Sequence, residues 1–127
     1  MVIDSDVLIR YLTKDDQVKA KRFKSFLSSG KKGLLTDTTC AEIYWTLSTL
    51  YKMSKKEIIP NMLGIINHKA IKCNCDVLTE CFDILSTNNT SLIDAYEAAY
   101  AKLYNDSKIL SYDRGFDKLK GIKRVEP

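Results

Sequence analysis

The sequence predicts an α/β fold, a three-layer α/β/α sandwich around a central, mainly parallel sheet. Two observations predict it. Short apolar runs alternate along the chain with longer segments of helical periodicity, a pattern typical of parallel strands joined by helices. The chain has 127 residues, 45% of them hydrophobic and 28% charged, with no internal repeat or linker. We therefore expect a single domain over residues 1–127, long enough to bury a core without disulfides.

Short apolar runs mark the expected strands. The first reads MVID and ends on the carboxylate of Asp4, and the last, near the C-terminus, is expected at an edge of the sheet. The five segments are residues 1–4, 33–36, 70–73, 108–113 and 122–125.

The first half of the chain contains four expected helices. Residues 5–14 begin at a Ser5 or Asp6 cap, and residues 15–30 stop at Gly30. Val18, Phe23, Phe26 and Leu27 supply much of the apolar face of the second of these helices. The next helix covers residues 37–52 with a cap near Asp37 or Thr38, and the fourth covers residues 54–68.

Capping patterns delimit the later helices too. Ser54 and Glu57 form a capping box at the start of the fourth helix, although Pro60 loosens its first turn or moves its start. Residues 76–89 end at an asparagine pair, and residues 91–106 begin at Ser91. Residues 115–120 form a single helical turn.

Composition excludes several classes of protein. No apolar run is long enough to span a membrane, and no basic region precedes a long apolar stretch as in a secretory signal, so we expect a cytoplasmic protein without membrane contact. The four cysteines lack paired ligand spacing and are expected to be reduced thiols, mostly buried. The formal charge is +4, and its basic residues crowd into residues 19–24, as in a surface that follows a phosphate backbone or a merely solvated helix face.

Four acids carry the chemical prediction. Asp4 and Asp113 follow expected strands, while Glu42 and Asp94 lie in the first turns of helices. The carboxyl ends of parallel strands form one edge of a sheet, where α/β proteins place their sites. Glu42 and Asp94 also interrupt apolar surroundings, which predicts partial burial.

Clustered carboxylates repel one another unless a cation neutralises them. Oxygen ligands suit Mg²⁺ or Mn²⁺, and such an ion can activate water and stabilise charge on a phosphate. The sequence therefore predicts phosphodiester hydrolysis at a divalent metal. Each acid could also serve a purely structural purpose: Asp4 and Asp94 favour helix N-termini, and Asp113 favours a turn.

Four segments together resemble the signature motifs of PIN domains. They read DSDVLIRYL, EIYWTL, IDAYEAAYA and ILSYDRGFDKL, in the order and spacing of that family, and more narrowly they resemble VapC-type toxins. The resemblance covers essentially the whole chain. It implies a Mg²⁺- or Mn²⁺-dependent endoribonuclease with Asp4, Glu42, Asp94 and Asp113 as its acids and Ser111 as a supporting hydroxyl. It also implies a homodimer and a small antitoxin partner.

Two positions depart from the family pattern. Gly115 stands where many relatives carry a further Asp, and Asp6 stands where many have Asn. Asp6 is expected to compensate in part, and Glu97, one helical turn after Asp94, is either an outer ligand or a solvent-facing acid. Asp117 is expected on the surface.

Roles follow for the remaining candidates. Asp4, Asp94 and Asp113 are expected to bind the metal, and Glu42 to position the attacking water. The RNA backbone is expected to contact basic side chains, namely Arg10, Lys14, Lys21 and Arg22. The expected dimer face is an apolar patch of Tyr44, Trp45, Tyr51, Ile58, Met62 and Ile66.

Two other functions fit the same residues. A phosphatase or receiver-like domain would use a nucleophilic aspartate. Such a site requires a lysine at a strand end near Asp113, and the only lysine at such a position is Lys108, which lies upstream. The other is a PIN-like module that binds RNA or protein without cleavage, and Gly115 is the feature that leaves this alternative open. The sequence does not specify which RNA is cut.

Overall fold

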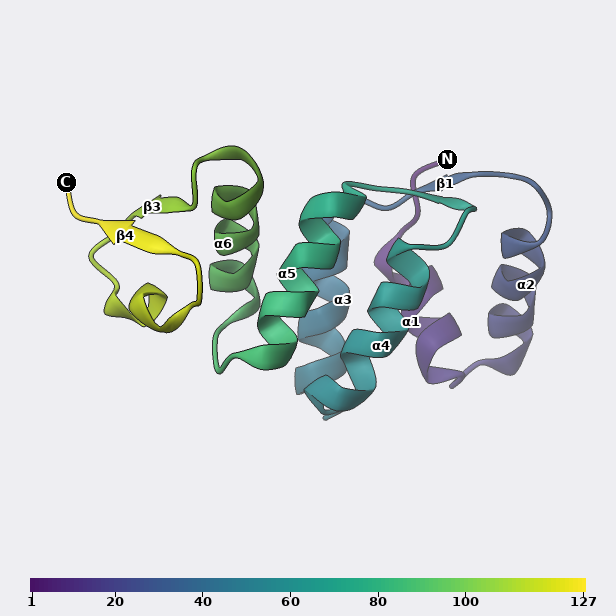
Figure 1. Ribbon diagram of the computed structural model, residues 1–127. Coiled ribbons are helices and arrows are strands. Elements are labelled where there is room, and N and C mark those ends of the chain that lie inside the picture. The colour runs from purple at the N-terminus through teal and green to yellow at the C-terminus, as the bar shows by residue number, and fades with distance from the viewer. The chain divides into compact units, whose positions relative to one another are not determined.

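Helices dominate the chain, and four short parallel strands accompany them (Figure 1). The structure is a computed structural model that describes residues 1–127. It divides into two units, residues 1–75 and 76–127, each with its own pair of parallel strands. Short parallel strands among amphipathic helices make an α/β fold, as predicted.

The predicted order of elements is confirmed except for the first strand, and the other strands are shorter than predicted. The first unit contains α1 (Ser5–Thr13), α2 (Gln17–Leu27), β1 (Gly33–Leu34), α3 (Asp37–Thr49), α4 (Lys55–Ile66) and β2 (Ile71–Lys72). The second contains α5 (Cys75–Thr87, which begins at the boundary), α6 (Leu92–Tyr104), β3 (Lys108–Leu110), the 3₁₀ helix η1 (Arg114–Lys118) and β4 (Lys123–Val125).

The strands of the first unit run in parallel. Gly33 pairs with Ile71 in the β1–β2 ladder, and the N-terminal segment joins on the other side of β1 through a single bridge between Val2 and Leu34. The predicted strand at residues 1–4 is thus reduced to this bridge. Gly33 permits the close approach, since a Cβ on it would lie 2.7 Å from Cγ1 of Ile3.

The second unit pairs β3 with β4, with Lys108 opposite Lys123 and Leu110 opposite Val125. The predicted strand over residues 108–113 ends early, because the chain turns after Leu110 to enter η1. The backbone N–H of Ser111 still donates to the carbonyl of Val125 at 2.9 Å. Helix α6 packs on β3, and its Ala95, Ala98 and Ala99 are fully buried.

Helices α1 and α2 pack against each other. The cap of α1 is Asp4, as its structural alternative predicted, and not Ser5 or Asp6, because the Asp4 carboxylate accepts the backbone N–H of Asp6. In α2 the structure buries Phe23 and Leu27, as predicted. The prediction that Val18 lies on the apolar face is wrong, since Val18 is 61% exposed.

Helices α3 and α4 lie side by side in Figure 1 and are in contact. Thr36 caps α3, one residue before the predicted Asp37 or Thr38, and its hydroxyl accepts the N–H of Thr39. The predicted capping box does not form, because the Ser54 side chain caps no backbone N–H and instead donates its hydroxyl to the Glu57 carboxylate at 3.2 Å. Helix α4 begins at Lys55 and includes Pro60, so its start is not displaced.

The predicted dimer patch is only partly on the surface. Trp45 and Tyr51 are exposed, at 60% and 38%. The three α4 members, Ile58, Met62 and Ile66, are at most 1% exposed and belong to the core of the chain, so their assignment to a dimer face was wrong. The spacing of apolar residues in α4 predicted a buried face correctly. The spacing alone does not show whether that face packs against the same chain or against a second copy.

Two expectations about composition can be compared with the structure. The four cysteines are free thiols, and two of them, Cys40 and Cys81, are buried. None of the helices has the length and apolar character needed to cross a membrane.

Candidate active site

The four candidate acids lie at starts of helices and are distributed over both units. The first unit holds Asp4, the cap of α1, and Glu42, in the second turn of α3. The second holds Asp94, in the first turn of α6, and Asp113, the cap of η1. The structure describes the two pairs separately.

Asp4 is fixed by its own helix. One carboxylate oxygen accepts the backbone N–H of Asp6 at 3.3 Å, and the side chain is exposed. Buried Ile3 and Leu8 on either side anchor the segment in the first unit. Capping therefore orients Asp4 and leaves its other oxygen available to a ligand.

Glu42 is exposed, contrary to the predicted partial burial. The buried stripe of α3 is formed by Cys40, Ile43 and Leu47, and Glu42 lies beside it. Its apolar neighbours in the sequence misled the prediction, because neighbours along a helix point to different sides.

Asp94 is half-buried, as predicted. Its backbone N–H donates to the Ser91 hydroxyl at 3.1 Å, so the cap orders the first turn and leaves the carboxylate unused. The adjacent Ala95 is completely buried and packs this turn into the unit. Glu97 is solvent-exposed on the next turn.

The Asp113 turn is the most highly organised of these segments. The Ser111 hydroxyl accepts the backbone N–H of Asp113 at 2.9 Å, and Asp113 Oδ1 accepts the N–H of Gly115 at 2.7 Å. Ser111 thus positions Asp113 through its backbone. A Cβ at Gly115 would come within 3.0 Å of Asp113 Oδ1, so glycine gives this turn its room.

Arg124 is a supporting residue that was not predicted from the sequence. Its guanidinium donates to the carbonyl of Ser111 at 3.1 Å and forms ion pairs with Asp117 at 2.9 Å and Glu126 at 2.7 Å. The hydrogen bond with Asp117, followed by that with Glu126, raises the pKa of Arg124. A basic residue in an edge strand among nearby acids was the available signal. Asp117 is an exposed ion-pair partner, as expected.

Asp6 and Arg10 belong to a second charged network. Arg10 pairs with Asp6 at 3.1 Å and with Asp15 at 2.5 Å, and the Tyr51 hydroxyl donates to the same Asp15 carboxylate at 2.9 Å. The Tyr51 hydrogen bond, together with Arg10, lowers the pKa of Asp15. Asp6 and Arg10, predicted as a compensating acid and an RNA contact, are thus engaged with protein partners. No sequence pattern pointed to Asp15, and Tyr51 was predicted only for the dimer face.

The candidate acids fit a hard divalent ion by their chemistry. All offer carboxylate oxygens, the ligands of Mg²⁺ and Mn²⁺, and none of the four takes part in an ion pair. Neither unit, taken by itself, gathers three or more Asp, Glu, His or Cys side chains into a metal site.

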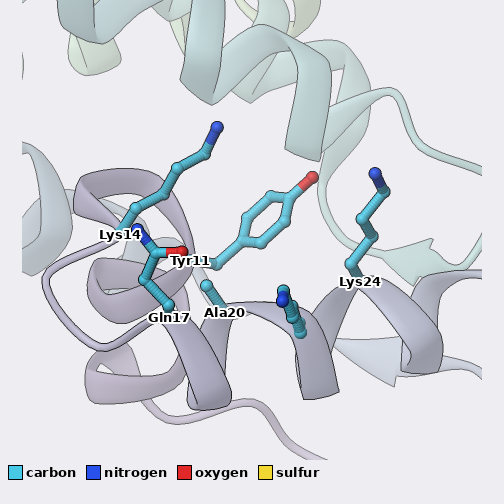
Figure 2. Close-up of a pocket in the computed structure, with 6 residues that line it drawn as sticks. Tyr11, Lys14, Gln17, Ala20 and Lys24 are labelled. Atoms are coloured by element: carbon cyan, nitrogen blue, oxygen red, sulfur yellow. The ribbon is translucent and has the colours of Figure 1, made fainter.

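Lys14 and Lys21 line an open pocket between α1 and α2, together with Lys24, which the prediction did not single out (Figure 2). Arg22 lies instead on a neighbouring groove with Arg10.

Comparison with known proteins identifies the family. The PIN domain model matches residues 1–122, nearly the full chain. No curated protein matches the chain. PIN domains are typically metal-dependent nucleases. Such chemistry uses acidic side chains and needs no histidine or cysteine nucleophile, which agrees with the acids described above. The chain belongs to the PIN domain family.

Proposed function

We propose that this protein is a divalent-metal-dependent endoribonuclease that hydrolyses RNA phosphodiester bonds at Asp4, Glu42, Asp94 and Asp113. One observation carries the proposal: the family match extends over all four acids, and none of them is neutralised by a basic side chain. Carboxylates that no protein cation neutralises suit a metal ion.

A single domain over residues 1–127 would bring the four acids together. In the first unit, the backbones of Met1 and Ile3 form hydrogen bonds with Leu34. The backbone groups of Val2 therefore face away from β1, and Val2 is 67% exposed. In the second unit, Ser111 bonds to β4, and Leu110 is 69% exposed. Exposed apolar strand edges favour pairing. We expect one parallel sheet within a three-layer α/β/α sandwich, with the acids at its carboxyl edge.

The roles of the residues follow from their surroundings. Asp4, Asp94 and Asp113 would hold Mg²⁺ or Mn²⁺, which would lower the pKa of a water and offset charge on the phosphate. Asp113 keeps its Oδ2 for this purpose, because Oδ1 accepts the N–H of Gly115. Exposed Glu42 would orient the attacking water. Ser111 keeps Asp113 in place through its backbone N–H.

The biological setting is proposed from the resemblance to VapC-type toxins. The protein would be the toxin of a type II toxin–antitoxin pair in the cytoplasm, inhibited by a small antitoxin. It would act as a homodimer, for which exposed Trp45, Leu50 and Tyr51 offer apolar surface. A short reading frame just upstream of the gene would support this setting.

Removal of metal should abolish cleavage. Purified protein incubated with labelled RNA is expected to cut it in Mg²⁺ or Mn²⁺ and to leave it intact in EDTA, because without a cation the carboxylates lack the charge to bind or activate the phosphate. Gel electrophoresis of the RNA gives the measurement.

The rival functions predict other results. Cleavage that persists in EDTA after exhaustive dialysis would contradict the proposal. Mg²⁺ binding with no hydrolysis of any RNA would favour a non-catalytic PIN-like module. A stable phosphoryl group on Asp4 would favour the phosphatase-like alternative.

A further inference from the structure

A basic pocket lies at the C-terminal end of α1, on the face where it packs against α2. Figure 2 shows the ring of Tyr11 standing in the pocket, with Lys14 on one side and Lys24 on the other. Lys21 and Gln17 complete the wall, and buried Ala20 belongs to the lining. The pocket is open to solvent and is lined by three lysines.

Local structure explains how these lysines gather. Lys21 and Lys24 are three positions apart on α2 and therefore share a face. Lys14 ends α1 in the left-handed conformation, at φ 56°, and its N–H donates to the carbonyl of Arg10 at 2.9 Å. Glycine or asparagine is usual at such a position, so a lysine here is a departure from common capping.

The acids nearest in sequence are committed to other groups. Asp15 pairs with Arg10 and accepts the Tyr51 hydroxyl. Asp16 caps α2 through the N–H of Lys19 at 3.0 Å, with the Lys19 ammonium 3.9 Å away. Each carboxylate is thus drawn toward a cation outside the pocket.

No carboxylate pairs with Lys14, Lys21 or Lys24. Three like charges around one pocket repel one another, and an anion would relieve that repulsion.

Tyr11 adds a fixed donor. Its ring packs edge-to-face on Phe23, with 5.2 Å between centroids, which holds its orientation. The hydroxyl points outward between the chains of Lys14 and Lys24 (Figure 2). Ammonium groups and one hydroxyl around an open hollow offer donors to several oxygens at once, which suits a phosphate. The aromatic ring also suits a single-stranded nucleic acid, whose bases stack on such rings.

We infer that the pocket of Tyr11, Lys14, Lys21 and Lys24 binds a backbone phosphate of the single-stranded RNA substrate, away from the bond that is cut. The inference rests on the proposed function for the identity of the ligand. Asp4 caps one end of α1 and Lys14 the other, ten residues later, so about 15 Å separates them at 1.5 Å per residue. The pocket therefore lies about 15 Å along α1 from Asp4, several nucleotides along a bound strand.

The test measures binding without cleavage. The probe is a fluorescein-labelled 12-nucleotide RNA in EDTA, titrated by fluorescence anisotropy over a series of salt concentrations. The variant Lys14→Gln/Lys21→Gln/Lys24→Gln should bind at least about tenfold more weakly. Its salt slope should fall by about 0.7, because a single strand contributes roughly 0.7 per phosphate contact and the pocket holds one phosphate.

The controls separate position from charge. Lys52→Gln/Lys56→Gln/Lys72→Gln removes three exposed lysines from the same unit, one of them also left-handed at φ 53°, and should bind within about twofold of the wild type. Lys14→Arg/Lys21→Arg/Lys24→Arg retains the charges and should restore affinity.

Length dependence gives a second measurement. The pocket variant should raise KM for a 12-nucleotide substrate and leave kcat and the KM of a three-nucleotide substrate unchanged.

Equal loss of RNA affinity in the control variant would overturn the inference, and so would loss of affinity only for a poly-glutamate peptide. Because binding is measured in EDTA, a protein that binds as expected and never cuts would contradict the nuclease proposal alone.

Discussion

Asp94→Asn is expected to reduce RNA cleavage by at least about 100-fold, and Asp4→Asn by a similar factor, as is typical when one charge-stabilising group is removed. Asparagine keeps the shape and removes the negative charge that a divalent ion requires. Neither carboxylate forms an ion pair, so the fold should not depend on the charge. Initial rates on labelled RNA at saturating Mg²⁺ give the measurement.

Asp76→Asn is the matched control for Asp94. Asp76 is an exposed acid in the first turn of α5, as Asp94 is in the first turn of α6, and it has no ion-pair partner. Its substitution should leave the rate within about twofold, since an exposed helix-terminal charge contributes only a few tenths of a kcal/mol. Unchanged thermal unfolding of all variants would separate lost chemistry from lost folding. Full activity of Asp94→Asn would remove this residue from the site.

Leu8→Ala is expected to lower the free energy of unfolding by about 2–5 kcal/mol, because it truncates a side chain with no exposed surface in α1. Its effect on cleavage should be indirect, through the helix that Asp4 caps. Urea unfolding followed by circular dichroism should show a lower midpoint with an unchanged slope.

Val7→Ala tests the same helix on its other side. Val7 is 41% exposed, so its truncation removes less buried surface and should change stability by less than about 1 kcal/mol. Equal losses in the two variants would mean that α1 does not bury the face described above.

The helices were predictable because they leave two independent signals. The period of apolar residues and the capping side chains agree for α6, where Ser91 was identified correctly. Where several cap residues stand in a row, as at Asp4–Ser5–Asp6, composition alone does not choose among them. The structure selects the one whose carboxylate reaches the next free N–H.

Strand lengths and burial were less predictable. A short apolar run indicates that a segment is buried but not how many partners it pairs with, so the strand predicted over residues 1–4 is a single bridge. The four acids of the candidate site remain a prediction from the sequence, since they stand at helix and strand ends but belong to units that the structure describes separately. The long-range partners of Arg10 and Arg124 could not be predicted, since those contacts depend on how distant turns meet.

The central claim is that carboxylates from both units hold the same ion. Titration with Mn²⁺, with the free ion counted by electron paramagnetic resonance, tests it most directly. The wild type should bind Mn²⁺ at a site that is lost equally in Asp4→Asn, from the first unit, and in Asp94→Asn, from the second, while Asp76→Asn retains it. Wild-type Mn²⁺ affinity in either Asp4→Asn or Asp94→Asn would contradict a shared site.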